Sequence, residues 1–258
     1  MLNPVWIALA LLAAPDCPAS RFVAPPAHAA NSRLPAPRVE AACAGDTLSV
    51  RSNGVPGFAF QPVTPGPLVP QRWRFSVPLS PALPAVHRPL PRLGPVGFTV
   101  TGLPLFGPNQ ADEPEDQAFG DPIENGIVDA CLGNTGPAGD YHLHGLAPAC
   151  VAAEGKPGQP SPLLGYAFDG FPIYGSKGCA DAACSAVVEF SSGWERAGDP
   201  RIDVWSAYRY TEKPGPATLD RCNGRLGPDG TYRYHATATF PYVLGCFAGR
   251  DVARQAAR

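Results

Sequence analysis

Residues 129–144, DACLGNTGPAGDYHLH, and residues 220–235, DRCNGRLGPDGTYRYH, share one ungapped pattern, D-x-C-x-G-x-x-G-P-x-G-x-Y-x-x-H. We call these stretches the first segment and the second segment. Glycine and proline are common in this chain, but cysteine, tyrosine and histidine are scarce, and three of the five histidines lie in the two segments. The sequence therefore predicts a duplicated structural element that presents histidine side chains.

Each segment combines a turn with a strand. The Gly-Pro-x-Gly portion predicts a tight turn, because proline fixes φ and glycine tolerates a positive φ. Side chains alternate along the strand that follows, so we expect Tyr141 and Leu143 on one face and His142 and His144 on the other. The second segment shows the same alternation, with Tyr232 and Tyr234 opposite Arg233 and His235.

The histidines are candidate metal ligands. If the two strands lie together in one sheet, a single polar face holds His142, His144 and His235 beside Arg233. Three neutral imidazoles suit Zn or Cu and leave a fourth position for water or substrate. Arg233 is permanently charged and cannot ligate, so it would attract an anion or repel the metal. Two other interpretations stay open, namely hydrogen-bonded histidines that support the turns and acid–base catalysis without a metal.

Four aspartates are further candidates. Asp140 and Asp169 are candidate oxygen ligands or partners of the ligating histidines. Asp129 and Asp220 occupy the same position in the two segments and could form a pair of carboxylates. An aspartate ahead of a glycine-rich turn is more often a turn cap, which is the interpretation we favour.

Composition favours an all-β fold with few short helices. The chain has 258 residues, 33 prolines and 28 glycines, and 45% of its residues are hydrophobic. These values predict many short strands joined by fixed turns, in a single disulfide-stapled, β-sandwich-like domain. The net charge of -2 gives no electrostatic basis for binding nucleic acid. We expect the partner to be a small molecule or a component of a cell surface.

The N-terminus indicates export. Residues 5–14, VWIALALLAA, form an apolar run of signal-peptide length that is short for a membrane span. We therefore expect a signal peptide at 1–20, an Ala/Pro-rich spacer at 21–42, the β domain at 43–250 and a tail at 251–258. The mature protein would be secreted or periplasmic, without a stable transmembrane segment.

Eight cysteines in an exported chain predict disulfides. The simplest pairing is local, and it joins Cys131 to Cys150, Cys179 to Cys184, and Cys222 to Cys246. A bridge between the segments, from Cys131 to Cys222, stays open. Cys43 has no partner if Cys17 leaves with the signal peptide.

Alternating apolar residues predict strands elsewhere in the chain. They occur at 48–50, 73–77 and 96–100, and again at 204–210 and 232–238. Residues 164–175 contain Asp169-Gly170 between apolar runs, which predicts a hairpin. No helix pattern of convincing length appears, although residues 186–196 could hold a short helix.

The chain resembles the YHYH-domain family of secreted or surface proteins, named for a Tyr-His-Tyr-His signature. The resemblance covers residues 48–249 in order, and its strongest pieces are YHLH at 141–144 and YRYH at 232–235. It also includes SNGVP at 52–56, GPVGF at 94–98, GLPLF at 102–106, the hairpin at 163–175, and FPYVLGCF at 240–247. Leu143 and Arg233 depart from the signature. The family implies no general reaction.

Three classes of function therefore remain. The first is an extracytoplasmic metal-binding module that uses His142, His144 and His235. The second is a secreted enzyme built on that metal site, although the chain has no G-x-S-x-G sequence and no visible triad spacing. The third is an interaction or adhesion domain in which the histidines are structural.

Overall fold

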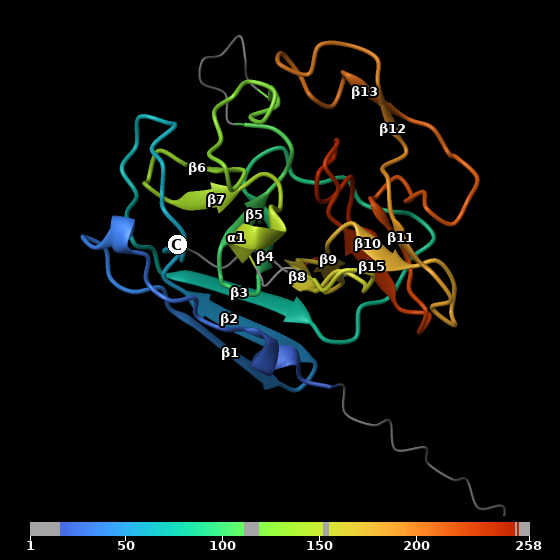
Figure 1. Ribbon diagram of the computed structural model, residues 1–258, viewed down its shortest axis with the longest axis horizontal. Coiled ribbons are helices and arrows are strands. Elements are labelled where there is room, and N and C mark those ends of the chain that lie inside the picture. Colours follow the sequence, from blue (N-terminus) through green and yellow to red (C-terminus); the bar gives the residue numbers. More distant parts are fainter. Residues whose placement is uncertain (1–15, 111–118, 152–154, 251, 253–258) are drawn as a thin grey trace, which may run out of the picture.

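The computed structural model describes residues 16–110, 119–151, 155–250 and 252. A three-stranded sheet lies against an eight-stranded sheet, which gives the expected sandwich-like, mainly β architecture (Figure 1). The buried residues of both sheets form one hydrophobic cluster. Phe75 of the small sheet stacks on Phe98 of the large sheet, with 4.7 Å between their ring centroids.

The small sheet consists of β1 (Val39–Ala44), β2 (Thr47–Ser52) and β3 (Trp73–Pro78), all antiparallel. Its strands alternate between buried and exposed residues as predicted, because one face covers the core and the other faces solvent. Leu48 and Val50 of β2 are buried, and Phe75 and Val77 of β3 join them. Two short 3₁₀ helices, Pro18–Arg21 and Ala29–Asn31, precede this sheet.

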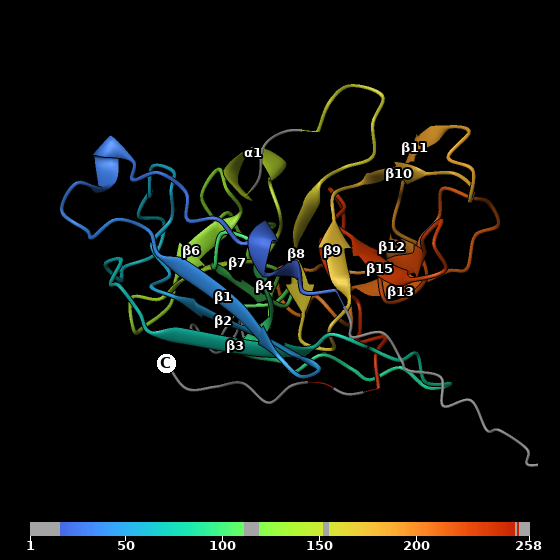
Figure 2. The ribbon, with the colours of Figure 1, turned by 90° about the horizontal axis from the view of Figure 1, so that it is seen from below.

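The large sheet has the order β14-β15-β9-β8-β4-β5-β7-β6, and Figure 2 shows β6 and β7 on one side and β15 on the other. Its strands in chain order are β4 (Pro95–Thr99), β5 (Pro104–Phe106), β6 (Gly133–Thr135), β7 (Tyr141–Leu143), β8 (Leu163–Ala167), β9 (Pro172–Tyr174), β14 (Gly224–Leu226) and β15 (Tyr232–His235).

The senses of strand pairing in the large sheet are symmetric about its centre, which lies between β4 and β8. On one side β4 pairs with β5 antiparallel, β5 with β7 parallel, and β7 with β6 antiparallel. On the other side β8 pairs with β9, β9 with β15 and β15 with β14 in the same three senses. Each pattern segment is therefore the edge hairpin of one half of the sheet.

The expected hairpin at 164–175 is confirmed as β8 and β9, and its Asp169-Gly170 turn has a Gly170 φ of 89°. The short helix that residues 186–196 could hold does not form. That region forms β11 (Val187–Glu189), which pairs with β10 (Lys177–Cys179), and β12 (Trp194–Arg196), which pairs with β13 (Tyr208–Tyr210). Valines at 187 and 188 favour a strand, and Gly193 interrupts any helix between the two pairs.

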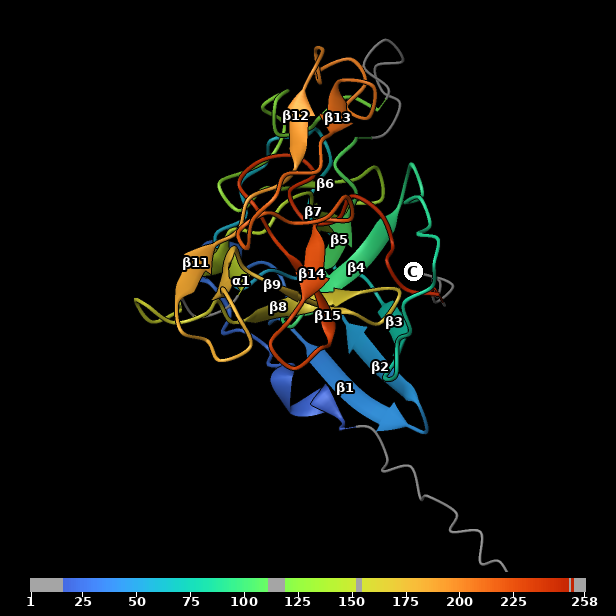
Figure 3. The same ribbon diagram turned by 90° about the vertical axis from the view of Figure 1, so that its right-hand side faces the viewer.

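The predicted strands at the two later positions are shorter than expected. Within 204–210 only β13 is a strand, and within 232–238 the strand ends at His235. The β12–β13 pair lies at the opposite end of the molecule from β1 and β2 (Figure 3). One short α-helix, α1 (Pro148–Val151), follows the first segment.

All three expected local disulfides form, namely Cys131–Cys150, Cys179–Cys184 and Cys222–Cys246. The fourth disulfide joins Cys17 to Cys43. This bridge differs from the expectation that Cys43 would be left without a partner. The segment that follows Cys17 packs on the fold through the buried side chain of Phe22.

The N-terminal boundaries drawn from the sequence also differ from the fold. Residues 21–42 were expected to be a spacer, but Phe22 and Asn31 are buried and β1 begins at Val39. Asn31 donates from its side chain to the carbonyl of Phe58, at 2.7 Å. Alanine and proline are abundant here, yet a few apolar and amide side chains are enough to anchor the segment. Nearly all of the expected tail at 251–258 lies outside the described residues.

Among the described residues, no helix has the length and apolar character needed to cross a membrane.

Candidate functional site

Asp129 and Asp220 cap the turns that begin the two segments. Asp129 Oδ1 accepts from the backbone nitrogen of Cys131 at 2.9 Å and of Gly133 at 3.2 Å. Its carboxylate also accepts from the Tyr141 hydroxyl at 2.9 Å. Asp220 accepts from the matching groups, the nitrogens of Cys222 and Gly224 and the Tyr232 hydroxyl. These contacts are those of the turn-cap interpretation. The strand order places the two carboxylates at opposite edges of the sheet, so they do not form a pair.

The aspartates also affect ionisation next to them. Burial raises the pKa of Asp220, while its hydrogen bonds from Gly224 and Tyr232 act in the opposite direction. Burial and the Asp129 carboxylate raise the pKa of Tyr141 well above its usual range, so this phenol stays protonated. Both aspartate–tyrosine pairs therefore act as fixed hydrogen-bonded supports for the strand that carries the histidines.

His142 and His144 form a buried pair on the face predicted for them. Their ring centroids are 4.9 Å apart and their planes cross at 70°. Phe106 of β5 stacks on His142, with centroids 3.9 Å apart. The relative exposures of His142 and His144 are 6% and 2%. The opposite side chains, Tyr141 and Leu143, lie in the core and so anchor the strand that carries the histidines.

Backbone carbonyls fix the ring orientation of this pair. His142 Nδ1 lies 3.0 Å from the carbonyl oxygen of Asp140, and His144 Nδ1 lies 2.8 Å from that of Gly107. A carbonyl only accepts, so Nδ1 donates in both rings, and in a neutral ring the lone pair is then on Nε2. Burial, with the neighbouring His142, lowers the pKa of His144 to about 3, so its imidazole is neutral at physiological pH.

Asp140 lies beside the pair, as the sequence suggested. Its Oδ2 is 3.9 Å from His142 Nδ1, and its side chain is 1% exposed. A carboxylate next to a histidine ring nitrogen stabilises positive charge on that ring or on an ion bound to it.

His235 lies in the same sheet but far from this pair in strand order. Four strands, β9, β8, β4 and β5, separate β15 from β7. The expectation that the two histidine strands would bring three imidazoles together requires neighbouring strands, and the topology does not provide them. His235 Nδ1 donates to the Gly175 carbonyl at 2.8 Å, the counterpart of the His144 bond to Gly107.

The surroundings of His235 are cationic and aromatic. Its ring meets Phe190 edge-to-face, with centroids 4.4 Å apart. Arg233 lies over the Tyr174 ring at 5.1 Å, and Arg225 lies over the Phe190 ring at 4.6 Å. Burial lowers the pKa of His235 to about 4, and the charges of Arg233 and Arg225 act in the same direction. This imidazole is therefore also neutral near pH 7.

Sequence reasoning missed the residues that receive these histidine bonds. Residues 97–107, GFTVTGLPLFG, and 165–175, GYAFDGFPIYG, follow a common pattern of glycines, aromatics and one proline. In the structure Phe106 and Tyr174 occupy matching positions, as do Gly107 and Gly175. This second pair of similar stretches, spaced differently from the two segments, was the signal that could have located the partners.

The comparisons with known proteins agree with the signature. The family model described as YHYH protein matches residues 74–249. The chain belongs to this family. The match includes both edge hairpins of the large sheet and the central strands between them. No curated protein matches the chain, and no solved structure does.

In this YHYH protein Asp169 has a structural role, because it joins the β8–β9 turn to β15 and to the chain that follows the second segment. It is fully buried and accepts from the Tyr234 hydroxyl at 2.5 Å, from Gly249 N at 2.8 Å and from Phe171 N at 3.3 Å. Burial raises the pKa of Asp169, and these hydrogen bonds oppose the shift. It ties the β8–β9 turn to the chain after the second segment and does not contact the histidine pair.

Within the described part of this YHYH protein, one group of three potential metal ligands lies close together: His87, Cys222 and Cys246. The two cysteines are joined in a disulfide, so the group offers a single imidazole. His87 Nδ1 lies 3.2 Å from Cys222 Sγ. This group does not have the donor set of a metal site.

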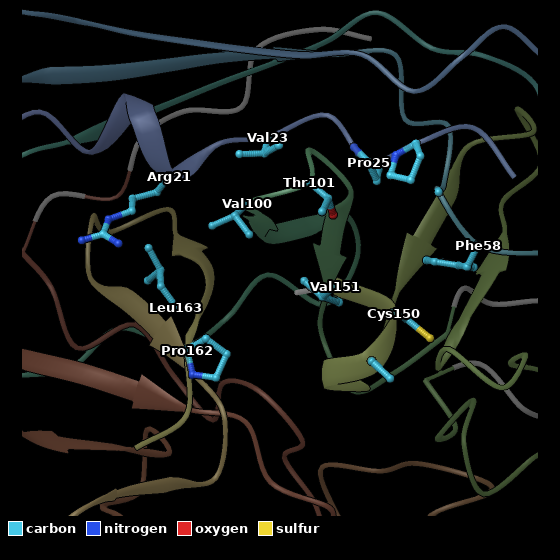
Figure 4. A pocket seen from close by; sticks show the side chains of 13 residues that line it. Arg21, Val23, Pro25, Phe58, Val100, Thr101, Cys150, Val151, Pro162 and Leu163 are labelled. Atoms are coloured by element: carbon cyan, nitrogen blue, oxygen red, sulfur yellow. The ribbon is translucent and has the colours of Figure 1, made fainter. Parts of the chain in front are cut away.

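A cavity of about 580 Å³ opens beside the N-terminal segment (Figure 4). Aliphatic and proline side chains dominate its wall, including Val23, Val100 and Leu163, and Arg21 is its single charged lining residue among those described. Its described lining residues include no aspartate, glutamate or histidine, Cys150 is held in a disulfide, and Thr101 has the one hydroxyl group. In this YHYH protein the chemically equipped positions are instead the two ends of the large sheet.

Proposed function

We propose that this YHYH protein is an extracytoplasmic metal-binding module that holds a copper ion between His142 and His144. The observation that carries the proposal is the contact of the His142 and His144 rings, whose centroids lie 4.9 Å apart and whose Nδ1 atoms both face backbone carbonyls. Histidines that bind metals commonly donate their second ring nitrogen to a carbonyl or carboxylate, which leaves the other nitrogen for the ion.

A pair of imidazoles suits copper better than zinc. Zinc in proteins takes four ligands, or three with an open position. Among the described residues, no group of three mutually close ligand atoms includes His142 and His144, and the carboxylate beside the pair is that of Asp140, whose Oδ2 is 3.9 Å from His142 Nδ1. Cu(I) accepts low coordination numbers and binds imidazole well. The apolar Phe106 ring and the burial of both histidines suit the singly charged ion better than a hydrated divalent one.

The experiment is an anaerobic Cu(I) titration of the oxidised, exported protein in competition with a chromogenic Cu(I) chelator, and a parallel titration with Zn. We expect one Cu(I) per chain in the wild type. His142→Ala and His144→Ala should each weaken binding by at least about tenfold. His235→Ala is the matched control, because its Nδ1 also bonds a glycine carbonyl at 2.8 Å but no second imidazole faces it.

Circular dichroism and thermal unfolding would accompany every variant. Copper binding that survives in both His142→Ala and His144→Ala would contradict the proposal. A folded wild type that retains no copper would also contradict it, and would favour an interaction domain whose histidines are structural.

We further propose that the protein is exported and processed ahead of Cys17. All eight cysteines are paired, which is typical of an oxidising compartment. A mature chain that began at residue 21 would lose the Cys17–Cys43 bridge. Intact mass measurement on protein recovered from the periplasm or medium tests this. A mature mass that lacks residue 17 would contradict it.

A further inference from the structure

A second cavity lies against His235 at the far end of the large sheet. It has a volume of about 110 Å³, and its lining includes Tyr174, Lys177, Phe190, Arg225, Arg233 and His235. Three of these side chains are cationic, and no aspartate or glutamate is among the lining residues. A concave site with cations and aromatic walls is suited to a small anion.

The two arginines are placed in a way that costs stability unless a negative charge is nearby. Arg225 of β14 and Arg233 of β15 are directly opposite each other in the register of the hairpin. Like charges at directly opposed positions of antiparallel strands destabilise a sheet. Both arginines are half-buried.

Nearby carboxylates neutralise only part of this charge. Asp229 Oδ1 pairs with Arg233 Nη2 at 2.6 Å, and Glu189 is opposite Lys177 in the β10–β11 register. Arg225 instead donates to backbone carbonyls, those of Pro216 and Leu226. Arg233 Nε is buried and has no hydrogen-bond partner among the described residues. The second segment therefore has a guanidinium N–H donor that the described residues leave without an acceptor.

The corresponding positions of the first segment hold no such charge. Asn134 stands opposite His142 where the second segment pairs Arg225 with Arg233. Around these positions the two edges are alike, since His144 and His235 make the same bond to a glycine carbonyl. The difference in charge is thus local to these positions.

We infer that the cavity beside His235 binds a small oxyanion, a phosphate, a sulfate or the carboxylate of a small acid, between Arg225 and Arg233. Lys177 and the Ser161 hydroxyl lie at the same cavity and can donate to the remaining oxygens. Water takes up about 30 Å³ per molecule in the liquid, so the volume suits an anion of a few heavy atoms rather than a polymer. This site is independent of the histidine pair in the first segment.

The test uses isothermal titration with inorganic phosphate, sulfate and acetate at constant ionic strength, with chloride as the balancing anion. We expect saturable binding of at least one oxyanion to the full exported chain. Arg225→Gln and Arg233→Gln should each weaken that binding by about tenfold or more, because each removes a charge-assisted hydrogen bond. Arg209→Gln is the control, since Arg209 lies on β13, outside the cavity lining.

Thermal unfolding distinguishes an anion site from a merely structural role. Without the anion, Arg225→Gln should unfold at the same or a higher temperature than the wild type, because it relieves the like-charge pair. With phosphate, the wild type should gain stability that the variant does not. The comparison of phosphate with acetate shows which oxyanion class fits.

Two outcomes would overturn the inference: no saturable binding of any of the three anions, or equal binding by wild type and Arg225→Gln. The double variant His142→Ala/His144→Ala separates this result from the copper proposal. It should keep its anion binding whether or not the wild type binds copper.

Discussion

Phe98 and Tyr166 are directly paired in the register of β4 and β8, at the centre of the eight-stranded sheet. Each follows a glycine, Gly97 or Gly165, and the two occupy matching positions of the 97–107 and 165–175 stretches. The two halves of the sheet extend outward from this pair in the same strand order. The hairpin with His142 and the hairpin with Arg225 and Arg233 therefore lie at opposite edges of one continuous sheet.

The central glycines are required by close backbone approach. A Cβ at Gly165 would overlap the carbonyl oxygen of Phe98, and one at Gly97 would meet that of Tyr166 at 2.5 Å. We expect Gly165→Ala to lower the free energy of unfolding by about 1–3 kcal/mol, as overpacking does. Urea denaturation measures the loss. Gly155→Ala is the control, since its nearest contact would be an ordinary 3.4 Å, and an equal loss there would contradict the argument.

Removing the Tyr234 hydroxyl should be costly. It donates to Asp169 at 2.5 Å and accepts from Ala248 N at 2.7 Å, and all three groups are buried. Tyr234→Phe leaves a buried carboxylate and a buried N–H without this partner, so we expect a loss of about 2–3 kcal/mol in unfolding free energy. Tyr210→Phe should change little, because its bond to Leu219 O is 3.5 Å long. Equal denaturation midpoints for the two variants would refute this.

The Cys17–Cys43 bridge should stabilise the fold more than Cys179–Cys184. The first closes a loop across 26 residues and the second across 5. Loop-closure entropy gives about 3.5 kcal/mol for the longer loop and about 2 kcal/mol for the shorter. We expect Cys17→Ser/Cys43→Ser to unfold at lower denaturant than Cys179→Ser/Cys184→Ser. The reverse order would show that residues 17–43 contribute little to the fold.

Acid should destabilise the anion-free protein partly through His235. Its pKa is about 4 in the fold, below the ordinary 6.5, so below pH 6.5 the unfolded chain binds a proton that the folded chain does not. The stabilisation is fully present above pH 6.5 and is lost as the pH falls toward 4. Between pH 7 and pH 5 we expect the wild type to lose about 1–2 kcal/mol more than His235→Asn. Urea midpoints at the two pH values check this, and equal losses would count against it.

The local structure followed from local pattern. Alternation along the strand predicted that Tyr141 and Leu143 would face the core and that His142 and His144 would share the other face, and both are observed. The turn-cap role of Asp129 and Asp220 and the three local disulfides also followed from residue type and spacing. Each of these features depends on residues close together in the chain.

The partners of the site residues could not be read in the same way. Phe106 reaches His142, and Gly107 accepts from His144, only because β5 and β7 pair in parallel across a long connection. Cys17 meets Cys43 because the segment between them packs on the core through Phe22 and Asn31. Neither contact can be predicted from a repeating pattern of residues that are close together in the chain.

The sequence by itself determined the turns and strand faces of the two segments, the hairpin at 164–175 and the family. Strand order was decided by the tertiary structure alone, because pairing between distant strands depends on how the whole core packs. That order puts four strands between His235 and the histidine pair, and so divides what looked like one set of ligands into an imidazole pair at one end and a cationic cavity at the other.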